Sequence, residues 1–436
     1  MALSFVGLIA AGTLLLCFPA ATGDGRGTPL LDALFTATSA TCVTGLIVRD
    51  TPVFFSRFGQ LVILGLIQLG GLGIMTFSAS LAVVFGRRLG AARRRVVADL
   101  IEESRNIDIG QTLRYIVLFT LTAEALGTLL LFMRWLPEYP NPWYALYVAG
   151  FHSVSAFCNA GFSLFPDSLV HYAADPAVNL VVIGLIVSGG LGFVVVHEML
   201  NRETVRRGPV FSFRRLTVHS RMVLWTTGLL TLAGTVLFFF FEYDGVLAAL
   251  PVPAKLVASV FQAVTPRTAG FNTVSMAGLK PVTLLLFLAL MFIGASPGST
   301  GGGIKTSTFA VLFMAVRSRI RGRQDVEVHG RVVPKDVVYR ATSIAVTSVA
   351  IVAGFFILLL ATETGAFQDV LFETTSAFGT VGLSTGLTGQ LSPVGRVLVT
   401  LLMYIGRLGP LTLALAMRAR VSRLPIEYPS SEVMVG

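Results

Sequence analysis

Four short stretches of this chain share a Phe, a Ser or Thr four residues later, and a Gly within six further residues. They run from Phe35 to Gly45, Phe151 to Gly161, Phe261 to Gly270 and Phe372 to Gly382. Gly adopts left-handed backbone angles without the roughly 1–2 kcal/mol penalty that other residues incur, so carbonyl groups near it can turn inward in succession. Rings of such carbonyls can replace the water shell of a monovalent cation. Recurrence at intervals of about 110 residues predicts four loops around one axis.

The residues predicted to face the cation are each Gly and the residue before it, acting through their backbone carbonyls. They are Thr44, Gly45, Ala160, Gly161, Ala269, Gly270, Val381 and Gly382. The third copy is one residue shorter and contains Pro266 and Arg267, so we expect pseudo-symmetry and not a fourfold ring. A single Gly of this kind can also end a helix or mark a packing contact. Because four copies occur in the same context, the pattern favours an ion pathway over a helix end or a packing contact.

The composition indicates which elements hold these loops. Of all residues, 54% are hydrophobic and 13% are charged, whereas about 25% are charged in globular proteins. Eight apolar segments reach the ~20 residues that a membrane-crossing helix needs. They lie near 1–21, 59–85, 111–136, 177–200, 221–242, 281–316, 339–361 and 394–418. A shorter stretch precedes each Gly motif, which predicts an all-α integral membrane protein with four helix, pore-loop, helix repeats and eight transmembrane helices around a central pore.

The predicted boundaries follow from these segments. Repeats cover 1–86, 111–200, 221–316 (with a broken last helix) and 339–418, linkers cover 87–110, 201–220 and 317–338, and a tail covers 419–436. The linkers are rich in Lys and Arg, which marks the cytoplasmic side. We therefore expect both termini in the cytoplasm and the loops entering from outside, where acidic residues would attract cations. The net charge of +10 is then a topology signal, and nucleic-acid binding is not expected.

A Gly-rich run interrupts the sixth apolar segment between Gly294 and Thr306. Pro and many Gly residues do not continue a regular helix. A phosphate-binding loop is excluded because Ile304 precedes Lys305 and no strand leads into the run. Two readings remain: a helix break that only packs, and a mobile intramembrane loop under the filter.

Charged residues inside apolar segments form a second group of candidates. Lys305 and Arg407 lie within predicted spans, where charges are rare and face a cavity or a partner. We expect the charge of each residue to be neutralised by a partner, or the residue to help hold the ion path shut. Glu124 is expected to be a buried carboxyl satisfied by neighbouring helices. The Cys and His residues have no metal-binding or catalytic spacing, so no enzyme is expected.

At this point the chain resembles the superfamily of potassium transporters that includes the Trk, Ktr and HKT proteins. The stretch Thr265-Pro-Arg-Thr-Ala-Gly-Phe-Asn272 is specific to it. Eight spans make the chain most similar to the KtrB membrane subunits. The resemblance implies that Gly45 favours potassium over sodium, since some plant members have Ser there, and that the Gly-rich loop is the gate with Arg407 beneath the filter. The expected gate residues are Gly294, Ser296, Pro297, Gly298, Gly301, Gly302, Gly303, Lys305 and Arg407.

The resemblance also implies a setting for the chain. It predicts passive potassium uptake across the cell membrane by a homodimer seated on a cytosolic, KtrA-like ring of nucleotide-binding regulatory subunits. Potassium is the transported ion, and sodium as an activator is left open. Two alternatives remain: the ion-binding subunit of an ATP-driven potassium pump, and a proton- or sodium-coupled transporter. A coupled transporter would want paired carboxylates at the membrane midplane, and Glu124 stands alone there.

Overall fold

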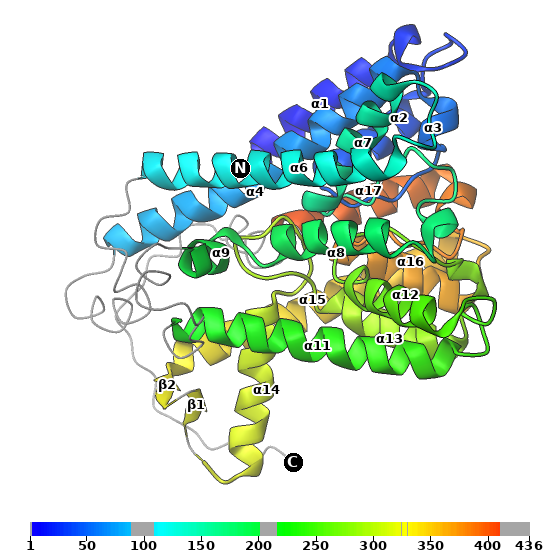
Figure 1. The fold of residues 1–436 in the computed structure, drawn as a ribbon. Coiled ribbons are helices and arrows are strands. Elements are labelled where there is room, and N and C mark those ends of the chain that lie inside the picture. Colours follow the sequence, from blue (N-terminus) through cyan, green and yellow to red (C-terminus); the bar gives the residue numbers. More distant parts are fainter. Residues whose placement is uncertain (1, 89–108, 201–215, 324, 329, 410–436) are drawn as a thin grey trace.

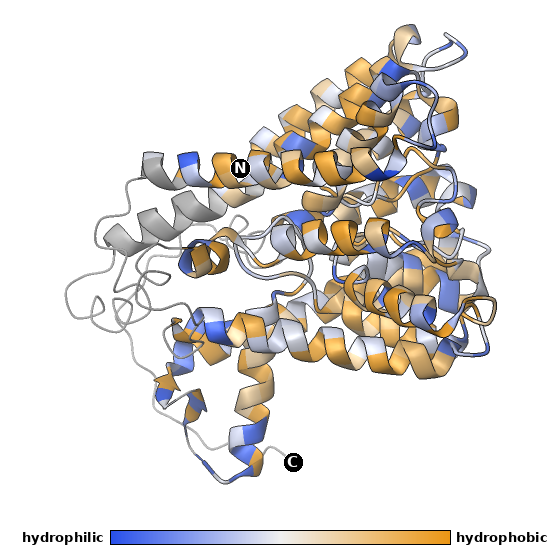
Figure 2. Ribbon diagram, viewed as in Figure 1, coloured by the Kyte–Doolittle hydropathy of each residue, from blue (hydrophilic) through white to orange (hydrophobic). Residues whose placement is uncertain are grey.

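The computed structural model describes residues 2–88, 109–200, 216–323, 325–328 and 330–409. The predicted linkers 87–110 and 201–220 lie mostly outside this part, and the tail 419–436 lies entirely outside it. The described chain is mostly helical, and its helices run largely side by side (Figure 1). Hydrophobic residues dominate the middle of these helices, whereas hydrophilic residues gather towards their ends and in the connections (Figure 2).

The long apolar segments form ten helices. They are α1 (Ala2–Cys17), α4 (Arg57–Arg88), α6 (Ile109–Trp135), α8 (Pro176–Gly190), α9 (Phe193–Leu200), α11 (Val218–Glu242), α13 (Pro281–Phe292), α14 (Thr306–Ile320), α15 (Lys335–Thr362) and α17 (Pro393–Leu408). Within the described residues, α6, α11 and α15 are each long and apolar enough to cross a membrane, and α8 with α9 makes a fourth if the bent pair is one span. The other apolar segments form helices that do not meet this test within the described residues, so the eight predicted spans stay a prediction.

Four helices of 12–16 residues end a few residues before the motif glycines. We call them the short helices, because they lack the ~20 residues that a span needs. They are α2 (Leu30–Thr41), α7 (Pro142–Phe157), α12 (Val252–Val264) and α16 (Phe367–Gly379). A residue with extended backbone begins each one, and in α7 the Asn141 side chain accepts from the Trp143 N–H at 3.0 Å, as an N-cap does. The motif phenylalanines Phe35, Phe151 and Phe261, with Phe372, are all fully buried. These rings fix the short helices in the core.

The remaining elements are small. A four-residue helix, α3, spans Thr51–Phe54, and single 3₁₀ turns span Pro19–Ala21, Val170–Tyr172, Met276–Gly278 and Thr388–Gln390. Strands β1 (Val326–Val328) and β2 (Arg331–Val333) form an antiparallel hairpin with Val326 opposite Val333. This hairpin departs from the all-α prediction and lies inside the predicted linker 317–338, as does the start of α15.

The fourth apolar segment contains a bend that the sequence did not predict. Helices α8 and α9 meet at 104°, and Gly192 between them has φ +86°. The N–H of Phe193 donates to the carbonyl of Gly298 at 3.2 Å. The bend therefore presses against the Gly-rich loop, which lies between α13 and α14.

Three glycines let the helix that follows a Gly loop touch the end of the short helix that precedes the loop. A Cβ on Gly70 of α4, Gly189 of α8 or Gly406 of α17 would collide with the carbonyl oxygen of Thr41, Phe157 or Phe378, respectively. Across units, α7 packs on α4, α12 on α8, α16 on α13 and α2 on α17. These contacts close the four short helices into a ring.

Gly189→Ala tests this close approach. The added methyl group has no space against the Phe157 carbonyl, and overpacking of this kind costs about 1–3 kcal/mol. We expect a lower midpoint of thermal unfolding in detergent. Gly184→Ala is the matched control on the same helix, because no atom lies within 4 Å of its added Cβ. Equal midpoints for the two variants would contradict the packing argument.

Candidate functional site

The four motif glycines meet at one place. Each has a positive φ, of 94°, 69°, 80° and 93° at Gly45, Gly161, Gly270 and Gly382. An added Cβ would meet the next loop every time: Gly45 against the Ala160 carbonyl, Gly161 against the Gly270 Cα, Gly270 against the Val381 carbonyl, and Gly382 against the Thr44 carbonyl. The contacts run from the first loop to the fourth and back to the first. All eight residues predicted to face the cation thus lie in one closed ring.

The backbone of each loop alternates in handedness. The residue two positions before each Gly also has a positive φ: Val43 at 54°, Asn159 at 59°, Thr268 at 75° and Thr380 at 48°. The residue between them has a negative φ in every loop. This alternation turns successive carbonyls to the same side. Left-handed angles at non-Gly residues cost energy and cluster at functional sites.

The recurring Ser or Thr of the motif holds each loop to its short helix. Ser39 and Ser376 accept from the N–H groups of Gly45 and Gly382 at 3.1 and 3.2 Å. Ser155 and Thr265 instead donate to the carbonyls of Phe162 and Phe271 at 2.8 and 2.5 Å. The N–H of the residue before each Gly bonds back to the carbonyl of the same Ser or Thr. One N–H group of every loop, together with the Gly N–H of the first and fourth loops, is thereby satisfied, while the carbonyls stay available.

Several buried hydroxyls at the ring have no partner within the described chain. Thr44, Thr268 and Thr380 are all fully buried, and none of their hydroxyls makes a hydrogen bond there. Buried polar groups in native proteins are nearly always satisfied by protein or by ordered solvent. Together with the free carbonyls and the C-terminal ends of four short helices, which carry partial negative charge, these oxygens fit a monovalent cation and its remaining water.

The Gly-rich loop lies directly against this ring. A Cβ on Gly301 would collide with the Thr268 hydroxyl, and one on Gly302 with the Thr380 hydroxyl. The N–H groups of Ser296 and Thr300 donate to carbonyls at the end of α8, Gly190 and Gly189, at 3.1 and 3.2 Å. The loop is therefore an ordered structure held between α8 and the third and fourth filter loops.

Further contacts within the loop involve the remaining predicted gate residues. Gly294 N–H donates to the Ile304 carbonyl at 2.9 Å, Gly298 and Gly303 have φ of 72° and 65°, and the Pro297 carbonyl faces Gly192. Lys305 donates through Nζ to the Gly301 carbonyl at 2.6 Å. Lys305 thus closes its own loop and does not point at a carboxylate.

Arg407 connects this loop to another helix. Its side chain is 3% exposed, Nη1 donates to the Thr300 carbonyl and Nη2 to the Gly70 carbonyl at 3.1 Å. Within the described chain no carboxylate lies within ion-pair distance of it. The guanidinium therefore holds loop and α4 together through backbone groups only.

Two further residues show contacts that the sequence did not predict in detail. Arg267 of the third motif reaches α11, where it donates to the carbonyl and hydroxyl of Thr227 and to the hydroxyl of Thr231 at 3.3–3.4 Å. Glu124 accepts from Gln68 Nε2 at 3.1 Å and is buried between helices. The Cys158 thiol of the second motif also lies 3.9 Å from Glu124 Oε1, so Glu124 packs between helices beside the second loop and is not one of the eight ring residues.

The acidic residues at the predicted outer side are less available to attract cations than their number suggests. Asp32 is buried and pairs with Arg49 at 2.7 Å and Arg396 at 2.5 Å. Glu138 and Asp175 both pair with Arg134. Of the loop acids, Asp50 is partly buried, and this burial raises the pKa of its carboxyl. The predicted acidic vestibule is therefore partly neutralised by arginines.

Comparison with known proteins gives consistent matches over the whole chain. The family model for TrkH, described as cation transport protein, matches residues 4–423. Ktr system potassium uptake protein B of Vibrio alginolyticus is 41% identical over 100% of this chain and 94% of its own length. The protein of the same name from Bacillus subtilis is 39% identical over 100% and 96%.

Two further matches complete this picture. The potassium/sodium uptake protein NtpJ of Enterococcus hirae is 33% identical over 100% of this chain and 96% of its own. The crystal structure of the potassium transporter TrkH from Vibrio parahaemolyticus superposes with a TM-score of 0.75, covering 96% of this chain and 83% of that one at 21% identity, which shows that the fold is shared. The chain therefore belongs to the TrkH family of cation transport proteins, a family of transporters and not of enzymes.

Proposed function

We propose that this chain is the potassium-conducting membrane subunit of an uptake system. The observation that carries the proposal is the closed ring of four Gly loops, with free carbonyls and unpartnered hydroxyls at its centre. The names of its relatives, potassium uptake proteins, support the choice of ion. Four helix, pore-loop, helix repeats with eight spans around one pore account for the succession of elements, with α8–α9 and α13–α14 as interrupted spans.

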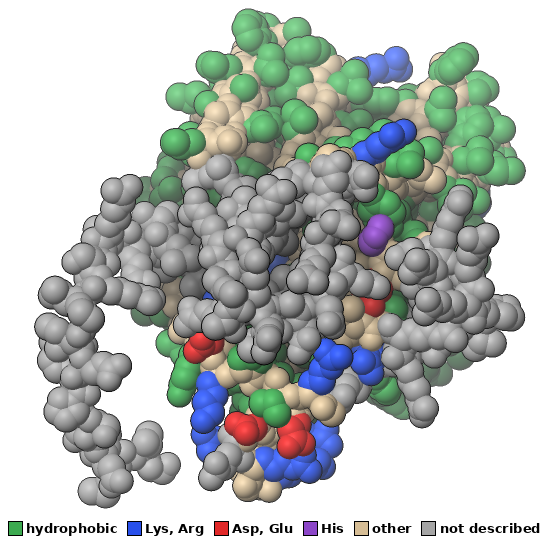
Figure 3. All heavy atoms as spheres, turned by 90° about the vertical axis from the view of Figure 1, so that its left-hand side faces the viewer, with side chains coloured by type: hydrophobic (Ala, Val, Ile, Leu, Met, Phe, Trp, Pro, Cys, Tyr) green, Lys and Arg blue, Asp and Glu red, His purple; other side chains and the backbone are tan. Residues whose placement is uncertain are grey.

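The charge distribution supports the proposed orientation in the cell membrane. Arg and Lys side chains gather at one end of the molecule, around the hairpin and α14 (Figure 3). Positive residues favour the cytoplasmic side. The Gly loops then open towards the outside, and both termini face the cytoplasm.

We further propose that the loop from Gly294 to Thr306 gates the pore. It abuts the filter loops at Gly301 and Gly302, and its conformation depends on glycines and on a few polar contacts. Arg407 acts as a latch, because its two carbonyl bonds join the loop to α4. Opening requires these bonds to be exchanged for water.

Passive flux fits the described contacts better than coupled transport does. Coupled transport needs an ionisable group that can exchange a proton or ion with the pathway, whereas the buried Glu124 carboxylate is bonded to Gln68 and contacts the Cys158 thiol, and it is not one of the ring residues. A pump would require a separate ATP-hydrolysing subunit. Sodium as an activator is a further proposal, for which the potassium/sodium uptake protein NtpJ gives a precedent by name.

The proposed assembly is a homodimer on a ring of nucleotide-binding regulatory subunits, in line with relatives that are named as parts of a Ktr system. One described surface supports self-association. Helix α14 stands away from the main body (Figure 1) and exposes Phe313, Val316 and Ile320, which are spaced along one helix face, with 52%, 59% and 81% of each residue accessible. In a membrane protein such an apolar face contacts lipid or protein, and we propose that this one contacts the partner protomer.

Gly45→Ser tests the filter. Ser at φ +94° is strained and its Cβ would collide with the Ala160 carbonyl, so the ring should widen or distort. We expect the preference for potassium over sodium to fall by about tenfold, which corresponds to a loss of about 1.4 kcal/mol in the difference between the binding free energies of the two ions. The measurement is rubidium uptake into proteoliposomes driven by a potassium gradient without ATP, with sodium as competitor.

One control and one further variant accompany this experiment. Gly65→Ser on α4 adds a side chain where no atom lies within 4 Å of the Cβ and should leave selectivity unchanged. Deletion of 297–303 should raise uptake by removing the loop. If folded protein takes up no rubidium even with this deletion, passive conduction is wrong and an obligate pump subunit becomes the better hypothesis.

Arg407→Met tests the latch. The variant loses both bonds to carbonyls, and hydrogen bonds from charged groups contribute about 1.5–3 kcal/mol each. If the latch favours the closed loop, rubidium uptake should rise by about tenfold, which corresponds to 1.4 kcal/mol. Arg319→Gln, at an exposed position of α14, is the control for loss of positive charge. Unchanged or slower uptake by folded Arg407→Met protein would contradict the latch.

Ile320→Glu combined with Phe313→Gln tests the assembly. Charge and polarity on the exposed face of α14 should shift the purified protein from dimer to monomer, as measured by light scattering in detergent. Leu69→Gln combined with Leu229→Gln is the control for loss of exposed apolar surface elsewhere, at side chains that are 57% and 56% exposed. A dimer that persists in the α14 variant would place the interface elsewhere.

A further inference from the structure

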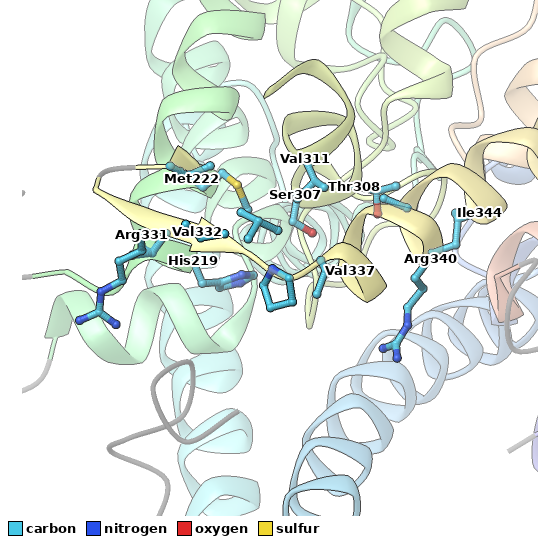
Figure 4. A pocket seen from close by; sticks show the side chains of 15 residues that line it. His219, Met222, Ser307, Thr308, Val311, Arg331, Val332, Val337, Arg340 and Ile344 are labelled. Carbon is cyan, nitrogen blue, oxygen red and sulfur yellow. The ribbon is translucent and has the colours of Figure 1, made fainter. Parts of the chain in front are cut away.

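A cavity of about 650 Å³ lies at the Arg-rich end of the molecule, between α11, α14, the hairpin and α15 (Figure 4). Most of its lining residues are apolar, and Arg331 and Arg340 direct their guanidinium groups away from it (Figure 4). Neither arginine is therefore presented to a ligand there. The buried polar groups that the conduction path leaves unexplained lie elsewhere, on the short helices beside the ring.

The residue that follows the motif Phe is polar in every repeat. These residues are Thr36, His152, Gln262 and Glu373, and each is at most 2% exposed. A buried polar side chain costs stability unless it is hydrogen-bonded, and replacing a bonded pair by apolar groups of the same shape is often nearly neutral. Packing alone therefore does not explain a polar residue at the same place in four repeats.

Gln262 and Glu373 hold the chain that leaves the ring after the Gly. We call these stretches the outgoing segments; they cover 46–49, 162–165, 271–274 and 383–388. Gln262 donates through Nε2 to the Thr273 hydroxyl at 3.1 Å. Glu373 accepts from the Ser384 hydroxyl at 2.8 Å and from the Thr388 hydroxyl. No ion pair joins Glu373 to a Lys or Arg of the described chain, so these hydroxyls hold its carboxyl group.

His152 does the same for the second outgoing segment, and the position of its proton follows from its partners. Nδ1 lies 2.8 Å from the Val148 carbonyl, which can only accept, so Nδ1 carries the proton. Nε2 is left to accept from the Ser163 hydroxyl at 2.9 Å and from the Leu164 N–H at 3.3 Å. The neutral ring thus links α7 to the chain two and three residues after Gly161.

The first repeat uses a different residue for the same tie. Within the described chain no hydrogen bond joins Thr36 to its outgoing segment, and residues 46–49 include no hydroxyl group. Asp32, one turn earlier on α2, is instead paired with Arg49 at 2.7 Å. A short helix therefore contacts its own outgoing segment through a side chain in all four repeats.

These ties act on a different part of the loop from the motif Ser or Thr. The motif hydroxyls bond the Gly N–H in the first and fourth loops, and the carbonyl of the residue directly after the Gly in the second and third. The ties of His152, Gln262 and Glu373 act two or more residues after the Gly. Each Gly is thus held close by and again further along the chain, which restricts the directions in which its carbonyl can turn.

We propose that His152, Gln262 and Glu373 are positioning residues for ion selection by the ring. This inference rests on the proposed function, because it takes the four Gly loops as the place where potassium is distinguished from sodium. Carbonyl rings favour one cation over another by the number and placement of the oxygens around it. Loss of a tie lets the outgoing segment move, the Gly carbonyl loses its fixed direction, and the smaller sodium ion is held nearly as well as potassium.

A double-variant cycle in the third loop tests this inference. Gln262→Met keeps the shape of the side chain and loses the bond, Thr273→Val removes the other end, and the double variant removes both. We expect the preference for potassium over sodium to fall by about fivefold in Gln262→Met, the factor to which one hydrogen bond of ordinary strength corresponds. The double variant should lose no more, because both changes remove one interaction. The measurement is rubidium uptake into proteoliposomes by the full-length protein with sodium as competitor.

Two further readouts separate positioning from a purely structural role. The double variant leaves neither partner of this bond unpaired, so its midpoint of thermal unfolding should lie close to that of the wild type while its selectivity is reduced. Ser259→Ala is the matched control, because its buried hydroxyl bonds to the Lys255 carbonyl within α12 at 2.7 Å. Unchanged selectivity in folded Gln262→Met protein, or an equal loss in Ser259→Ala, would overturn the inference.

Glu373 allows a rescue experiment in the fourth loop. Glu373→Met removes the acceptor of both hydroxyls and should reduce the preference for potassium by about fivefold or more. In Glu373→Gln the amide can bond both hydroxyls, through its carbonyl oxygen and its N–H, so selectivity should be largely retained. Thr374→Val is the control on the same helix, since that hydroxyl donates to the Val370 carbonyl at 2.6 Å. Equal losses in the two Glu373 variants would contradict positioning by this side chain.

Failure of the proposed function would be seen separately. If folded wild-type protein takes up no rubidium, conduction is wrong, and the inference is then judged by ion binding. Potassium bound at the ring raises the midpoint of thermal unfolding. Gln262→Met should reduce the excess of this rise over the rise that sodium gives, whereas Ser259→Ala should not. An equal excess in the two variants would refute the inference independently of transport.

Discussion

The structure depends on one constraint: four stretches of non-helical backbone must meet inside a membrane without leaving N–H groups unsatisfied. Backbone of this kind is tolerated at membrane depth only where it lines a cavity or is buried in protein. In each loop the N–H of the residue before the Gly bonds back to the end of its own short helix, at the carbonyl of Ser39, Ser155, Thr265 or Ser376. The carbonyls are then left for the pathway. The loops can approach this closely only because the contact residues are glycines.

The helices that flank the loops also approach each other closely at glycines. The third unit is the exception. In the other units Gly70, Gly189 or Gly406 brings a long helix onto the end of a short one. In the third unit the long helix stops at Phe292 and resumes at Thr306. The intervening chain turns towards the ring, so the departure from symmetry and the candidate gate have the same origin. The bend at Gly192 belongs to this arrangement, because α9 is bonded to the loop through Gly298.

Features that repeat along the chain could be predicted from the sequence more readily than features that depend on a single three-dimensional contact. The Gly motifs and apolar segments predicted a helical membrane protein and the residues that meet at the ring. The order of loops around the ring followed only from the contacts between them. Gly70 and Gly189 carry no signal beyond a Gly pair in an apolar run, so their role could not be separated from ordinary tolerance of Gly in spans. The hairpin at 326–333 was missed because its strands have three residues each.

The partners of the buried basic groups could not be predicted for a physical reason that bears on gating. A charge in a span suggests a carboxylate partner, but Arg407 bonds to backbone carbonyls and Arg267 to a carbonyl and two hydroxyls. Breaking a buried ion pair leaves an uncompensated charge and costs about 3–5 kcal/mol, whereas carbonyl bonds to a guanidinium can be exchanged for bonds to water at lower cost. A carboxylate beside the pore would also bind the passing cation and retain it. In the proposed gate, neutral partners would allow Arg407 to hold the loop without making its release prohibitive, and the ends of four short helices would offset the positive charge near the ring.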